Sequence, residues 1–270
     1  MPTSDDSEQV ALRHAADRRL AQALALIEGA ARDGIGLRLA GGLAAYRHAV
    51  DRTFMARQFS DIDVVCASRH AARLPRVLAG MGYVENPHVA QATGGGQLQF
   101  VRELDPTDHV DVFLDVIRMD HDVDLRGRLD IDPWAISPAD VLLSKLQIGR
   151  FADKDGHDVI GLLKDLTVSE GDDARSICVG RIARACAADW GMFVDVCANL
   201  ETVAALARYD VPAAQRAPVI RRLAGLREAL AFEDKPLRFR LRARVGKRLP
   251  WRRDVEEREG SPVVAPRSAA

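Results

Sequence analysis

Two glycines, followed about twenty residues later by an alternating acidic pair, constrain most strongly what this chain can fold into. Apolar alternation over residues 35–39 predicts a short strand that runs directly into Gly41 and Gly42. Two glycines let a backbone approach phosphate groups closely, because no Cβ stands between them; the ordinary alternative is a tight turn that binds nothing. Asp61 and Asp63 follow on a second apolar strand, where the period of two places both carboxylates on one face.

The acidic pair needs a partner of opposite charge. Two ionised carboxylates about 4 Å apart repel by roughly 4 kcal/mol at an effective dielectric of about 20. Mg²⁺ would relieve this repulsion, since it prefers oxygen ligands and binds phosphates readily. We therefore predict that Asp61 and Asp63 hold two Mg²⁺ ions for in-line nucleotidyl transfer from an NTP, with pyrophosphate as the leaving group. The alternative is a pair of solvated surface acids.

A third acid should come from the strand predicted over residues 109–117. Asp111 and Asp115 are both candidates, because they alternate onto the same predicted face. We prefer Asp111, which opens the strand, and keep Asp115 as the alternative. His109 is interpreted as incidental.

The residues before the acidic pair and two later helices add candidate ligands. Ser60 is predicted to contact the nucleotide, and Arg57 is interpreted as an ion-pair partner of the acidic strand. Lys145 could neutralise a triphosphate as a compact point charge, or simply be solvated. Lys154 and Asp158, on a helix predicted over 154–166, could face the site or lie on its surface.

Helical periodicity and helix-start signals outline the rest of the chain. An opening helix is predicted over 5–32 and is expected to pack on a first domain that ends at residue 166. Ser137–Asp140 is the clearest helix start, with a serine N-cap, a proline at the first position and an acid in the first turn. Residues 167–232 form a predicted helical C-terminal region, with a break near Pro212.

Residues 233–270 differ in composition from the rest and are predicted to be a basic arm and a disordered tail. Segment 235–253 is rich in Lys and Arg and contains no acid. Over 237–245 apolar residues alternate with arginines, which predicts a strand with one cationic face. Such a face could bind RNA phosphates, including those of tRNA, or could keep an edge strand from aggregating. The residues after Arg253 have a disordered composition.

Overall composition excludes some classes of protein. A net charge of −1 gives no global attraction to nucleic acid or anionic membranes, so any such contact must be local. No apolar run approaches the roughly 18 residues that a membrane span needs, and the polar N-terminus is unlike a signal peptide. The four cysteines contain no CxxC pair, which argues against zinc and favours a reducing, cytoplasmic setting.

Five segments, in order, resemble the DNA-polymerase-beta-like nucleotidyltransferase superfamily. The similarity is strongest to its minimal and abortive-infection-type bacterial branch, which includes toxins that modify tRNA. The segments lie between residues 35 and 166: Ala40–Ala44, Arg57–Asp63, His109–Asp115, Ser137–Leu146 and Lys154–Asp158. One departure is Leu43, where the family often has a small hydroxyl residue after the glycine pair.

The resemblance implies an α+β fold, in which a small mixed β-sheet is flanked by helices and a helical C-terminal region closes the cleft. It also implies Mg²⁺, an NTP donor, and Asp61 and Asp63 as metal ligands with the strand acid as the third. Lys145 and Asp158 fall where the branch has its later functional Lys and Asp. The acceptor stays open between RNA, protein and small molecule. The alternative is a catalytically inactive nucleotide-binding or toxin–antitoxin-type partner protein on the same fold.

Overall fold

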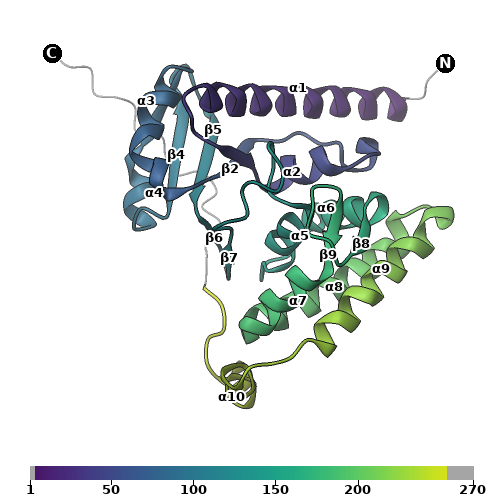
Figure 1. Ribbon diagram of the computed structural model, residues 1–270. Coiled ribbons are helices and arrows are strands. Elements are labelled where there is room, and N and C mark those ends of the chain that lie inside the picture. The colour runs from purple at the N-terminus through teal and green to yellow at the C-terminus, as the bar shows by residue number, and fades with distance from the viewer. Residues whose placement is uncertain (1–3, 254–270) are drawn as a thin grey trace.

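A five-stranded mixed sheet organises the N-terminal half of the chain (Figure 1). The computed structural model describes residues 4–253. Strands β2 and β5 run parallel, and all other neighbours in the sheet are antiparallel. In spatial order the strands are β1 (Leu37–Leu39), β2 (Asp61–Cys66), β5 (Asp105–Leu114), β4 (Gln97–Arg102) and β3 (Tyr83–Asn86). The α+β class with a small mixed sheet flanked by helices is thereby confirmed.

The two faces of the sheet differ in polarity, as alternation predicts. One face is apolar and fully buried, and it includes Ile62, Val64, Phe100, Val110 and Val112. The opposite face carries the acidic residues described below. This division means that any one-residue slip of a strand would place its charged side chains in the core.

Helix α1 (Ser4–Arg32) lies alongside the sheet (Figure 1). It buries one stripe of small and branched residues: Ala16, Leu20, Ala23, Ile27 and Ala30. Arg19 and Gln22 anchor it to β5, because both donate hydrogen bonds to the Asp108 carboxylate. The helix predicted over residues 5–32 corresponds to α1.

Helices α2 (Gly41–His48), α5 (Pro138–Leu146) and α6 (Asp153–Asp165) pack together beside the sheet. Helix α5 begins as predicted, since the Ser137 hydroxyl accepts a hydrogen bond from the backbone N–H of Asp140. The Asp140 carboxylate is fully buried and is paired with Arg128 and Arg181. These two ion pairs offset the free-energy cost of burying the Asp140 carboxylate.

Smaller elements connect these parts. They are η1 (Arg52–Met55), η2 (Ser68–Arg73), α3 (Leu74–Ala79), α4 (Pro87–Ala92), the hairpin β6 (Val116–Arg118) and β7 (Asp122–Asp124), and the parallel pair β8 (Thr167–Ser169) and β9 (Ser176–Cys178). The pair β8 and β9 was not predicted, because three-residue strands are too short to show a period.

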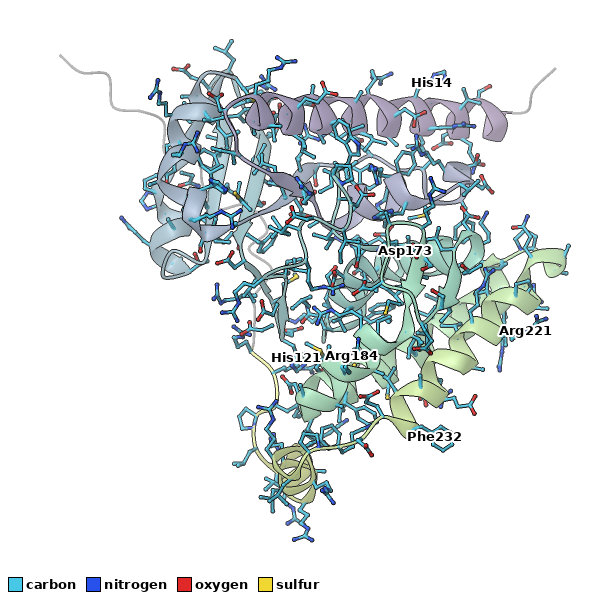
Figure 2. All side chains as sticks on the ribbon, in the orientation of Figure 1. His14, His121, Asp173, Arg184, Arg221 and Phe232 are labelled. Atoms are coloured by element: carbon cyan, nitrogen blue, oxygen red, sulfur yellow. The ribbon has the colours of Figure 1, made fainter. Side chains whose placement is uncertain are left out.

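The C-terminal region is a cluster of three helices, α7 (Val179–Ala188), α8 (Trp190–Asp210) and α9 (Ala213–Phe232). The predicted break near Pro212 is present, but a second break occurs at Asp189, whose carboxylate caps the first turn of α8. On α9 the apolar stripe is buried, whereas Arg221 and Phe232 lie on its exposed surface (Figure 2).

Within residues 4–253, α8 is long and apolar enough to cross a membrane by length and composition. The expectation that no segment is long and apolar enough to span a membrane is therefore wrong by the criteria of length and composition. In the structure, 44% of its most apolar window is buried, and the helix packs against α6, α7 and α9. Core helices of soluble proteins have the same composition.

The arginine-rich segment is a helix, α10 (Leu237–Val245), so the predicted strand is wrong. Arg and Leu form helices readily, and no described strand lies where it could pair with this segment. Pro236 precedes the helix and Gly246, at φ +61°, follows it, which are start and stop signals for a helix. Phe239 is buried edge-on against Phe193 of α8. A short 3-10 turn, η3 (Gly246–Arg248), completes the arm.

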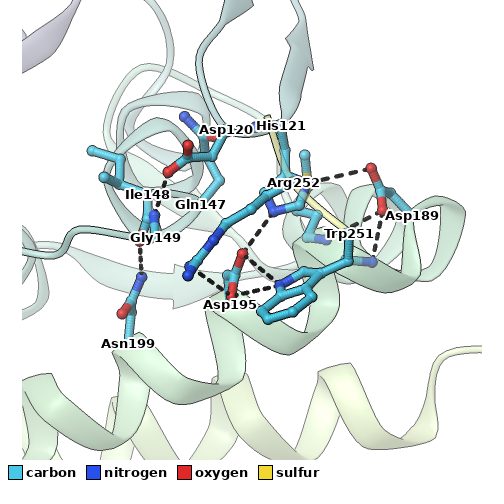
Figure 3. A network of polar contacts seen from close by, with 12 residues as sticks. Asp120, His121, Gln147, Ile148, Gly149, Asp189, Asp195, Asn199, Trp251 and Arg252 are labelled. Carbon is cyan, nitrogen blue, oxygen red and sulfur yellow. Dashed lines mark hydrogen bonds and ion pairs between the residues drawn. The ribbon is translucent and has the colours of Figure 1, made fainter. Parts of the chain in front are cut away.

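The last described residues pack onto α8 and a neighbouring loop (Figure 3). The indole N–H of Trp251 donates to both carboxylate oxygens of Asp195 at 3.2 Å, and Arg252 lies 3.5 Å from the same carboxylate. The ring of His121 lies between two acids, 2.9 Å from Asp195 and 3.6 Å from Asp189. Residues 254–270, predicted to be disordered, lie outside the described residues.

We expect the stability of the protein to decrease as the pH rises through the pKa of His121. Burial disfavours the charged ring, but hydrogen bonds to Asp189 and Asp195 outweigh burial and raise this pKa to about 9. Because the unfolded value is about 6.5, the stabilisation is complete below about pH 6.5 and is lost toward pH 9. The free energy of unfolding should therefore fall by about 2–3 kcal/mol over this range.

Urea unfolding followed by circular dichroism at several pH values measures this dependence. His121→Asn should remove most of the decrease, whereas His88→Gln, at an exposed histidine, should keep it. Equal pH dependence in His121→Asn and the unsubstituted protein would contradict the assignment.

Candidate functional site

The register of β2 and β5 gathers the predicted acids on one face of the sheet. Asp63 lies directly beside Asp111, and Asp61 lies beside His109. Neighbours in register on parallel strands share a face, so these four side chains form one patch. Asp61, Asp63 and Asp111 are therefore brought together as the sequence predicted, and His109, which was interpreted as incidental, joins them.

Asp111 is buried and held by two amides of β4. The side chains of Gln97 and Gln99 donate to its Oδ1 at 3.2 and 3.1 Å. Burial raises the pKa of Asp111, although the nearby His109 and both amides oppose this shift. The polar row continues across the sheet to Asn86 on β3, which donates to Gln99.

Asp63 is the most strongly perturbed carboxylate of the patch. Burial raises its pKa well above the usual range, and the negative charges of Asp61 and Asp111 raise it further. Its Oδ2 lies against Gly41, where a Cβ would overlap with the carboxylate. Gly41 also has a φ of +59°. Glycine is therefore required here both for the backbone conformation and for the close approach of Asp63.

Asp115 does not belong to this face, so the alternative third acid is excluded. Strand β5 ends at Leu114, and Asp115 is the one non-glycine residue with positive φ within residues 4–253. A left-handed residue interrupts the strand alternation that the prediction assumed. The Asp115 carboxylate accepts a hydrogen bond from the backbone N–H of Ser68 and lines a separate open pocket.

A cavity of about 300 Å³ lies beside the acids. Its walls come from the turn before α2, from the start of β2, from α5 and α6, and from residues 117–119. They include Gly41, Gly42, Leu43, Arg57, Ser60, Asp61, Asp63, Lys145 and Lys154. Helix α2 begins at this cavity without a side-chain cap, so its first backbone N–H groups can bind an anion there.

One wall of the cavity is a quartet of two cations and two anions. Lys145 lies 2.8 Å from Asp155 and 3.0 Å from Asp158, both on α6. Burial opposes the charge of Lys145, but the two carboxylates outweigh burial and raise its pKa. Arg57 forms two hydrogen bonds with the fully buried Asp158. Its partner is thus Asp158 on α6 and not the acidic strand, which corrects the interpretation from sequence.

Two further predicted residues lie at the cavity with different surroundings. Ser60 is exposed, and its hydroxyl lies 3.3 Å from Asp61 Oδ1. Lys154 is exposed at the start of α6, makes no ion pair with any residue between 4 and 253, and lowers the pKa of Asp63 by its charge. Lys154, and not Lys145, is therefore the lysine whose charge is free for a ligand.

Sequence analysis missed three contributors to this site. His109 was detectable, since it precedes Asp111 by two residues and must share its face. Gln97 and Gln99 alternate in the same way, but their position beside Asp111 depends on the β4–β5 register. No local signal identifies that register.

Comparisons with known proteins add little to this geometry. Neither a scan of protein-family models nor a search of curated proteins found a match. Among solved structures, the chain is similar to the solution structure of the antibiotic-resistance factor ANT(2'')-Ia, at 13% identity and a TM-score of 0.34. That match covers 76% of this chain and 97% of the other. Since so low a score does not assign a family, we infer function from the residues of the site.

We predict that Gly41→Ala destabilises the protein more than Gly34→Ala. Both glycines have positive φ, at +59° and +69°, so both substitutions introduce backbone strain of about 1 kcal/mol. A Cβ at Gly34 meets open space, whereas one at Gly41 displaces the Asp63 carboxylate, which should about double the loss. Urea unfolding of the two variants gives the comparison. Equal losses would show that Asp63 does not depend on the glycine.

Proposed function

We propose that this chain is a Mg²⁺-dependent nucleotidyltransferase, which moves an NMP group from an NTP to a hydroxyl acceptor. The observation that carries the proposal is the in-register pairing of β2 with β5. It places Asp61, Asp63 and Asp111 on one face, and Asp61 and Asp63 also line the cavity with the glycine turn. We assign all three as metal ligands and catalytic residues.

The donor set fits a divalent cation. Three carboxylates share one patch, and burial, with a smaller contribution from their mutual repulsion, raises the pKa values of Asp63 and Asp111. A cation bound to these oxygens would remove that repulsion. Two bound Mg²⁺ ions would stabilise the attacking and leaving oxygens of the transfer.

The cavity provides contacts for the triphosphate. The start of α2 offers backbone N–H groups at Gly41 and Gly42, and the helix dipole favours an anion there. Lys154 contributes an unpaired positive charge, and Ser60 a hydroxyl donor. Lys145 supports the site indirectly, because with Asp155 and Asp158 it fixes α5 against α6 along the cavity wall.

We also propose a cytoplasmic location. All four cysteines are free, and three of them are buried. A reducing compartment is where such thiols are commonly found.

We expect Asp63→Asn to lower transfer from a labelled NTP by at least about 100-fold, since the substitution removes a ligand of the cations that would stabilise the transition state. Asp61→Asn should behave in the same way. Asp115→Asn is the matched control: asparagine tolerates positive φ and keeps the acceptor for Ser68, and the residue lies outside the cavity. Full activity in the Asp61 and Asp63 double variant would overturn the proposal.

The alternative, a catalytically inactive nucleotide-binding or toxin–antitoxin-type partner protein, gives a different result. Calorimetry would then detect Mg·NTP binding to the unsubstituted protein, while no labelled product forms with RNA, protein or small-molecule acceptors. Lys154→Gln should weaken NTP binding in either case, because Lys154 lines the cavity and forms no ion pair within residues 4–253.

Among hydroxyl acceptors, RNA is the one for which the chain offers a separate binding surface. Arg238, Arg240 and Arg244 are exposed on α10, whereas Arg242 is engaged with Trp190 and with backbone carbonyls. Since α10 is a helix, protection of an edge strand no longer explains these arginines.

Replacing Arg238, Arg240 and Arg244 by glutamine should weaken tRNA binding and reduce its salt dependence. Each lost phosphate contact should lower the slope of log K against log salt by about 0.7–0.9. Filter binding at several salt concentrations measures this slope. An unchanged slope would exclude α10 as an RNA surface without affecting the assignment of the acids.

A further inference from the structure

A mixed nitrogen and oxygen donor set lies within the acidic patch. Ligand atoms of Asp61, His109 and Asp111 all lie within 4.8 Å of one another. Asp61 and His109 are register partners on β2 and β5, and Asp111 follows His109 by two residues on the same strand. The backbone therefore holds all three donors on one face.

A backbone carbonyl determines which nitrogen of His109 faces the carboxylates. Nδ1 lies 3.2 Å from the carbonyl oxygen of Thr107, which can only accept, so Nδ1 carries a proton. Nε2 lies 3.5 Å from Asp111 Oδ2. In a neutral imidazole this Nε2 presents a lone pair to a carboxylate oxygen, and a cation between the two would stabilise the arrangement. A proton on Nε2 would also do so, and the experiment below separates the two cases.

Each of the three donors also has an outer hydrogen-bond partner. Thr107 fixes the ring of His109, and the Gln97 and Gln99 amides bind Oδ1 of Asp111, which leaves its Oδ2 facing His109. The Ser60 hydroxyl lies 3.3 Å from Oδ1 of Asp61. Outer partners of this kind orient the ligands of protein metal sites.

From this geometry we infer that Asp61, His109 and Asp111 form a site for a first-row transition-metal dication such as Co²⁺ or Fe²⁺. Imidazole nitrogen suits these ions, whereas Mg²⁺ takes oxygen ligands. Tetrahedral ligands at about 2.1 Å from an ion are about 3.4 Å apart. His109 Nε2 and Asp111 Oδ2, at 3.5 Å, already have this spacing, and Asp61 needs to close by at most about 1.4 Å from the 4.8 Å limit. The role of this ion in transfer rests on the proposed function, but its binding does not.

The test uses the full chain without nucleotide, titrated with Co²⁺ and separately with Mg²⁺ in a calorimeter. His109→Gln should weaken Co²⁺ binding at least about ten-fold and change Mg²⁺ binding by less than about two-fold, because only Co²⁺ gains from the nitrogen ligand. His88→Gln, at an exposed histidine, is the matched control and should change neither affinity.

Proton NMR of the Co²⁺-loaded protein supplies a readout that needs no variant. The Nδ1 proton of a Co²⁺-bound His109 should give a strongly shifted resonance that disappears in D₂O. Unchanged Co²⁺ affinity in His109→Gln, or no such resonance in the unsubstituted protein, would overturn the inference even if transfer proceeds with Mg²⁺. Co²⁺ binding through His109 without nucleotide transfer by any ion would overturn the proposed function and leave this site intact.

Discussion

The parallel pairing of β2 with β5 is the interaction on which the site depends. Residues almost fifty positions apart become neighbours through it, and each register pair places one β2 residue beside one β5 residue. Arg19 of α1 reinforces this pairing, because it donates both to Asp108, just before the part of β5 that pairs with β2, and to the carbonyl of Ser60, just before β2. A helix outside the sheet thus fixes the spacing of the two strands that carry the acids.

Electrostatics divides the surroundings of the cavity into two parts. The acidic patch concentrates negative charge in a partly buried place, and burial, together with the neighbouring carboxylates, raises the pKa values of Asp63 and Asp111. The quartet of Arg57, Lys145, Asp155 and Asp158 balances its own charges and contributes rigidity. Uncompensated charge of one sign is unfavourable for stability, and proteins tolerate it chiefly at functional sites.

Predictions from the sequence were accurate where local interactions decide the structure, and less accurate where distant segments meet. Local patterns succeeded at the Ser137 cap, at the alternation of β2 and at the break near Pro212. Prediction failed for α10. Its apolar residues alternate with arginines as they would in a strand, but Arg and Leu also form helices readily. Prediction also failed at Asp115, because one left-handed residue ends the alternation of β5. The partner of Arg57 depended on where α6 packs, which no local pattern indicates.

The amino-acid sequence by itself determined the acidic strand and its glycine turn, since these follow from periodicity and from the steric freedom of glycine. The α+β class was implied by the resemblance of five sequence segments to a known family. Only the tertiary structure decided that Asp111 and not Asp115 completes the patch, that His109 joins it, and that Lys145 is paired while Lys154 is free. The physical reason is that strand register and helix packing arise from the burial of apolar faces across the whole domain. Contacts between distant segments are consequences of that burial and leave no signal in the local sequence.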